Sequence, residues 1–170
     1  FIFKTELIAL NSSPYSIKRI WLIWRVYMAK WSKKTFIEHI NQSCENDVAV
    51  NCLQLIDFSE KNSDEITWGT GDGCGTMTFR CHSDYGLLPL FRLSSNGKIN
   101  LQINFLRGKN LHKQILEDMI VKLESNFLRQ YDHESYSSDS YEEIEDLICT
   151  QNQLDTFIKT IEGCIYRLKQ

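Results

Sequence analysis

Two strand-like segments joined by an Asn-Gly pair constrain the fold of this 170-residue sequence more than any other feature. The second segment, residues 98–105, alternates apolar and polar side chains, which is typical of a strand with one buried and one solvated face. The first segment, residues 87–93, is apolar, and Pro89 indicates that it starts late or runs along a sheet edge. Asn96-Gly97 tolerates the positive φ angles of a tight turn. An antiparallel hairpin is therefore predicted here.

Two further strands are predicted upstream of the hairpin. Residues 76–81 alternate threonine and arginine with Met77, Phe79 and Cys81, and residues 65–68 begin the sheet. The intervening run holds Gly69, Gly71, Gly73 and Gly75. It lacks the Lys-Ser/Thr that follows the glycines of a phosphate loop, and its spacing fails the dinucleotide-binding fingerprint. We interpret the run as a tight or bulged strand connection, with a ligand-binding loop as the alternative.

Apolar residues at helical spacing predict helices on both sides of these strands. Ser32 is a plausible N-cap for residues 33–43, and the same period recurs in residues 48–58. Downstream, it recurs in residues 110–129 and 153–168. The predicted fold class is therefore α+β, with an antiparallel sheet of about four strands within residues 65–105. Two N-terminal and two C-terminal helices flank that sheet.

The length and composition are those of one globular domain. We expect residues 1–27 to be a non-native or disordered extension, with a short basic amphipathic helix on a membrane or partner surface as the alternative. Its apolar run, residues 20–28, is too short to span a membrane and contains Arg25. Residues 28–170 form the predicted domain. Within it, residues 131–146 carry many acidic, serine and tyrosine residues and are predicted to be a flexible, exposed linker.

Overall charge and cysteine usage exclude several classes of protein. The formal net charge of −3 does not by itself favour nucleic acid as a partner. The six cysteines include no closely spaced pair of the kind that zinc ribbons and redox motifs require. Scattered thiols of this kind are typical of a reducing compartment, so the expected location is the cytoplasm. We predict no cofactor and no metal site.

The sequence offers few groups of residues that could be catalytic. Cys74 lies in the glycine run and could meet His82 across a hairpin, which would make a nucleophile and a base. Glu65 lacks the nearby lysine of a nuclease-type metal motif, and the acidic residues at 142–146 lack the glycine and ligand alternation of a calcium loop. Whether the chain is an enzyme stays open, with a non-enzyme favoured. A small metal- or cysteine-dependent hydrolase, such as a nuclease-like enzyme, is the alternative.

The polar side of the predicted sheet is a better candidate for binding. Its strands carry arginine, lysine and amide side chains that alternation would place together, and Trp68 or Tyr85 could supply an aromatic rim. Such groups are those that proteins use to contact nucleic acids. The alternative is that this is the wetted face of a one-sided sheet. The candidate binding residues are Trp68, Arg80, Tyr85, Arg92, Lys98, Asn100 and Gln102.

The order of these segments resembles a family of small bacterial and archaeal accessory domains. The resemblance covers residues 31–107 and rests on a WGxG motif at Trp68–Gly71 and a hairpin of the type FxLxSxGxIxIxF that begins at Phe91. Gly75-Thr76 stands where that family has Gly-Ser. Such domains occur alone or beside restriction- or repair-type nucleases. The resemblance implies a context of DNA defence or repair, and it supplies no catalytic residue. Our leading interpretation is therefore a non-catalytic α+β module that binds nucleic acid or a partner protein through the sheet. No membrane span is expected, and the oligomeric state is not predicted.

Overall fold

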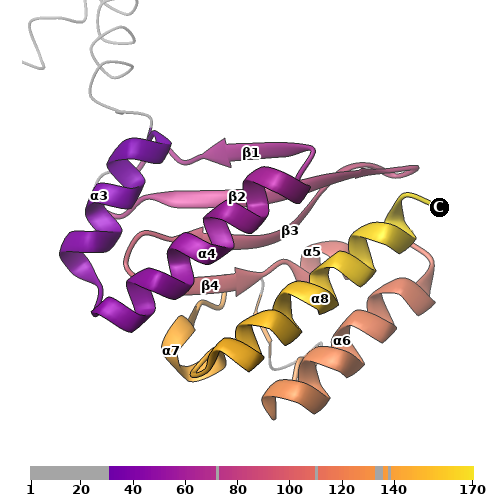
Figure 1. Cartoon of the computed structure of the whole chain (residues 1–170). Coiled ribbons are helices and arrows are strands. Elements are labelled where there is room, and N and C mark those ends of the chain that lie inside the picture. The colour runs from indigo at the N-terminus through magenta and orange to yellow at the C-terminus, as the bar shows by residue number, and fades with distance from the viewer. Residues whose placement is uncertain (1–30, 72, 110, 133–135, 138) are drawn as a thin grey trace, which may run out of the picture.

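A five-stranded antiparallel sheet carries helices against one of its faces (Figure 1). The computed structural model describes residues 31–71, 73–109, 111–132, 136–137 and 139–170. The strands pair in chain order. They are β1 (Glu65–Trp68), β2 (Thr76–Ser83), β3 (Gly86–Ser94), β4 (Lys98–Leu101) and β5 (Glu142–Glu143). The α+β class and the antiparallel sheet are as predicted, with one additional short strand.

The helices follow the apolar periodicity of the sequence. Before the sheet lie α3 (Lys33–Ser43) and α4 (Asn46–Asn62), and α5 (Ile103–Arg107) directly follows β4. The C-terminal part contributes α6 (Lys113–Phe127), α7 (Ile144–Leu147) and α8 (Gln151–Leu168). Ser32 caps α3 as predicted, since its hydroxyl accepts the amide hydrogen of Thr35. Thr150 caps α8 in the same way, through the amide of Gln153.

Aromatic packing joins the helices to the central strands. Phe79 on β2 is fully buried and stacks on Phe58 of α4, with ring centroids 5.7 Å apart, and on Phe91 of β3, at 5.0 Å. Phe91 in turn meets the edge of Phe157 on α8, at 6.0 Å. Because Phe79 and Phe91 are direct cross-strand partners, their side chains share the face that α4 and α8 cover. The core therefore lies between this face and the helices.

The turn between β3 and β4 is the predicted Asn-Gly hairpin. Gly97 has a φ angle of 80°, in the left-handed region that favours glycine. A Cβ atom at Gly97 would also lie 2.7 Å from Val48 Cγ1, so α4 packs closely on this turn. In the glycine run, Gly73 has a φ angle of 86°, and Gly75 is buried against Trp31 and Phe36. These contacts support the interpretation of the run as a structural turn.

The predicted strand at residues 98–105 ends early. β4 stops at Leu101, and α5 follows with Ile103 and Leu106 buried at helical spacing. Phe105, which strict alternation would place inside, is 40% exposed. Ile103 is buried under either pattern, so the apolar alternation runs on past the true end of the strand. From there the helical spacing applies, and Leu106 rather than Phe105 packs into the core.

The acidic stretch at residues 131–146 differs from the exposed linker that we expected. Glu142 and Glu143 form β5, and α7 follows with Ile144 and Leu147 buried. The amide of Ile144 donates a hydrogen bond to Gly97 O, which fixes this segment to the β3–β4 turn. Residues 133–135 and 138 of the stretch lie outside the described residues, as does the extension expected at residues 1–27. No helix among the described residues is long and apolar enough to cross a membrane.

Candidate functional site

The sheet face opposite α4 and α8 is polar, and the strand register arranges its side chains in rows. The central row runs across four strands, because Thr67 pairs with Thr78, Thr78 with Arg92, and Arg92 with Asn100. A second row on the same face begins with Glu65 on β1 and pairs it with Arg80 on β2. We call Thr67, Thr78, Arg80 and Arg92 the polar face.

Arg80 and Arg92 are diagonal neighbours on the polar face. The register shifts between Phe79 and Arg80, so that Arg80 pairs with Pro89 while Thr78 pairs with Arg92. Both arginine side chains are half-buried. Arg80 Nε is buried and has no hydrogen-bond partner within the described part of the chain. Leaving a buried guanidinium N–H unpaired costs free energy.

Tyr136 and Ser140 cover the β4 side of the sheet. Asn100 is fully buried, and its Nδ2 donates to Ser140 O at 2.5 Å. Gln102 is 5% exposed and donates to Asn100 Oδ1. The hydroxyl of Tyr136 accepts from the amide of Leu101 at 3.2 Å. Asn100 and Gln102, which the sequence placed in the candidate site, are therefore occupied by the chain's own hydrogen bonds.

At the edge of the polar face, two cationic side chains contact residues 141–143. Lys98 Nζ lies 2.7 Å from Glu143 Oε1, and this hydrogen bond raises the pKa of Lys98. Burial raises the pKa of Tyr141, while the charge and hydrogen bond of Arg92 oppose that shift. Tyr141 is 37% exposed, so an aromatic ring lies at the surface beside Arg92. The positive charge of Lys98 is balanced by Glu143, whereas Arg92 contacts the uncharged phenol of Tyr141.

The two predicted aromatic residues lie elsewhere. Trp68 pairs with Met77 and packs against Phe36 of α3, with ring centroids 5.3 Å apart, on the helix-covered side. Tyr85 is exposed in the turn between β2 and β3. The structure thus brings Arg80 and Arg92 together on the polar face and does not bring Trp68 to the same surface.

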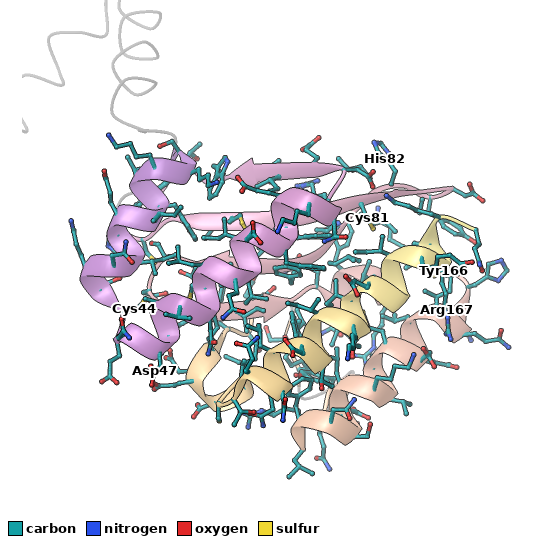
Figure 2. All side chains as sticks on the ribbon, viewed as in Figure 1. Cys44, Asp47, Cys81, His82, Tyr166 and Arg167 are labelled. Carbon is teal, nitrogen blue, oxygen red and sulfur yellow. The ribbon has the colours of Figure 1, made fainter. Side chains whose placement is uncertain are left out.

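Cys74 and His82 are not brought together. Cys74 Sγ lies 2.8 Å from Ser94 Oγ, near the β3–β4 turn, to which Cys44 is also adjacent. His82 is exposed toward the other end of β2, where its amide donates to Asp64 Oδ2 at 2.8 Å. Figure 2 shows Cys44 and His82 at opposite ends of the molecule. Among the described residues, no three or more His, Cys, Asp or Glu side chains are grouped so that they could hold a metal ion.

All six cysteines carry free thiols, and three of them are buried. Burial raises the pKa of Cys52 to about 12, that of Cys81 to about 11 and that of Cys164 to about 12. At pH 8, the fraction of a thiol with a pKa of about 11 that is deprotonated to thiolate is on the order of one in a thousand.

We therefore expect these three cysteines to resist a thiol reagent in the native protein at pH 8, while the exposed Cys149 reacts promptly. Counting labelled thiols by mass spectrometry before and after addition of urea measures this difference. A Cys149→Ser variant should remove the prompt label. Prompt modification of Cys52, Cys81 and Cys164 in the native state would show that these side chains are not buried as described.

A half-buried carboxyl group holds β5 against residues 129–131. Glu142 Oε2 lies 3.3 Å from Arg129 Nε, and Tyr131 is 1% exposed beside it. Burial raises the pKa of Glu142 above its ordinary value near 4.5, and the positive charge of Arg129 opposes that shift without reversing it. The folded state therefore binds the Glu142 proton more tightly than the unfolded chain does.

From this sign we expect Glu142 to lower stability progressively as the pH rises through and above 4.5. In Glu142→Gln the loss should be absent, so the stability of the variant relative to the wild type should increase from pH 4 to pH 7. Urea denaturation at several pH values measures the difference. Glu162→Gln, a change of the same kind on the exposed surface of α8, is the control. A relative stability of Glu142→Gln that falls over this range would contradict the assignment.

Sequence reasoning missed the contribution of the acidic stretch to this site. Its tyrosines recur at every fifth position, at Tyr131, Tyr136 and Tyr141, and two of the three are buried. Aromatic residues at regular spacing in an otherwise polar stretch were the available signal that it packs on the sheet.

Comparisons with protein-family models, with curated proteins and with solved structures found no match for the chain.

Proposed function

We propose that the chain is a non-catalytic binding module that contacts the phosphate backbone of a nucleic acid through the polar face. One observation carries the proposal. Arg80 and Arg92 are diagonal neighbours on the side of the sheet away from α4 and α8. Guanidinium groups bind phosphate oxygens through charge-assisted, bidentate hydrogen bonds. The hydroxyl of Thr67, in the same row as Arg92, supplies an uncharged donor.

Tyr141 favours a single strand over a duplex as the ligand. Its ring is exposed at the boundary of the polar face, next to Arg92. Bases of a single strand stack on aromatic rings of this kind while the backbone follows the cationic groups. The chain's net charge of −3 means that binding depends on these local groups and not on a general positive field. A role in DNA defence or repair, which the sequence resemblance implies, is part of this proposal.

Fluorescence anisotropy with labelled DNA of about 20 nucleotides, single-stranded and duplex, tests the proposal. Two phosphate contacts predict that affinity for the single strand falls about sevenfold between 50 and 200 mM salt. For a duplex the same two contacts predict a fall of about twelvefold. Binding to neither DNA nor RNA at about 50 mM salt would contradict the proposal and would favour a protein partner for this face.

A further inference from the structure

A second surface feature lies away from the polar face, where α5 meets α6 at the side of the helix layer (Figure 1). It is a hollow of about 510 Å³ lined by these two helices and by Lys109 and Leu111, which lie between them in the sequence. Leu106, Leu111 and Leu116 form its apolar floor, and each is at least nine-tenths buried. Ile120 and Val121 extend this apolar lining outward along α6, and Val121 is 61% exposed.

Three cationic side chains line the same hollow, namely Arg107, Lys109 and Lys113. They stand against one carboxylate, Glu117, so the local balance is 3 − 1 = +2 in a chain whose net charge is −3. No ion pair joins Lys113 to Glu117 in the described part of the chain, although they are one helical turn apart. Anions are therefore favoured here.

Two of the cations are held in place by neighbouring residues. Arg107 Nη1 donates to Asn104 Oδ1 at 2.7 Å, and Arg107 Nη2 donates to Tyr131 O. Lys109 Nζ lies 4.9 Å from the centroid of the Phe105 ring, within the range of a cation–π contact. Because these contacts restrict the side chains before any ligand arrives, less conformational entropy is lost when an anion binds.

We propose that this hollow binds an anionic amphiphile, with its carboxylate or phosphate group near Lys109 and Lys113 and its hydrocarbon chain along Leu111, Leu116 and Ile120. An apolar floor without charge would favour a neutral ligand, and a cationic cluster without that floor would favour a free ion. The combination matches a molecule with one anionic end and one linear apolar end. This site is independent of the proposed nucleic-acid contact, since it shares no residue with the polar face.

The test uses the full chain and three probes with the same hydrocarbon tail. Dodecanoate and dodecyl phosphate carry an anion, and dodecyltrimethylammonium carries a cation. Titration below the micelle concentration, followed by amide chemical shifts, should give saturable binding of the two anions, with changes centred on α5 and α6. Lys109→Glu combined with Lys113→Glu should weaken that binding about tenfold or more. Lys34→Glu combined with Lys159→Glu, the same charge change on exposed positions of α3 and α8, should leave it unchanged.

A further arm separates the two sources of such a ligand. Co-sedimentation with vesicles of anionic phospholipid, lost in the Lys109→Glu/Lys113→Glu variant, would identify lipid headgroups and acyl chains as the source. Binding of dodecanoate without co-sedimentation would identify a free amphiphile. Equal binding of the cationic probe, or anion binding that the double variant retains, would overturn the proposal. An Arg80→Ala/Arg92→Ala variant should bind dodecanoate normally, so the two proposals can fail separately.

Discussion

Replacing Phe79 by alanine is expected to lower the free energy of unfolding by about 3–5 kcal/mol. Phe79 is fully buried on β2, between Phe58 of α4 and Phe91 of β3. Its removal would leave a cavity at the junction between the helix layer and the two longest strands, and it would remove an aromatic contact between α4 and the sheet. Urea denaturation followed by circular dichroism measures the change.

Phe105→Ala is the matched control for this substitution. Phe105 is also aromatic, but it is 40% exposed on α5, and its described ring contact is with Lys109. Its loss should cost less than half as much as the loss of Phe79. If Phe79→Ala and Phe105→Ala were equally destabilising, the stacked rings of Phe58, Phe79 and Phe91 would not be what holds the helices on the sheet.

The second large effect is expected for nucleic-acid binding. Arg80→Ala combined with Arg92→Ala removes both guanidinium groups from the polar face. The salt dependence of single-strand binding should then lose most of its slope, because each phosphate contact contributes about 0.7 to it. Affinity at low salt should fall about tenfold or more. Neither arginine packs in the core, so thermal unfolding of the double variant should stay close to that of the wild type.

A control with the same loss of charge distinguishes a contact from a general field effect. Lys34→Ala combined with Lys159→Ala removes two positive charges from exposed positions on α3 and α8. We expect this variant to bind nucleic acid with nearly the wild-type salt slope. An equal loss in the two double variants would show that net charge, and not the polar face, governs binding.

Most of the fold could be predicted from local patterns. Ser32 and the spacing of Phe36 and Ile40 predict α3, and Asn96-Gly97 predicts the hairpin, because in each case the determining groups lie within a few residues of one another. α5 was missed because alternation and helical spacing agree at Ile103. The choice between them depends on packing of Leu106, which a local pattern does not contain.

The composition of the candidate site depended on long-range contacts and was predicted less well. Alternation correctly placed Thr78 and Arg80 on the polar side of β2, and the register then brought Arg92 beside them. It could not show that Ser140 would cover Asn100, 40 residues earlier in the sequence. The acidic character of the stretch around Ser140 predicted exposure, whereas Tyr136 and Ile144 fix it to the sheet and its turn.

The most direct test of the proposed binding surface is a map of amide chemical shifts during titration with a single-stranded oligonucleotide. The proposal predicts that the largest changes occur at Thr67, Thr78, Arg80 and Arg92, with smaller ones at Tyr141. Amides of α4 and α8, on the opposite side of the sheet, should be nearly unaffected. Changes concentrated on those helices, with the polar face unchanged, would contradict the proposal.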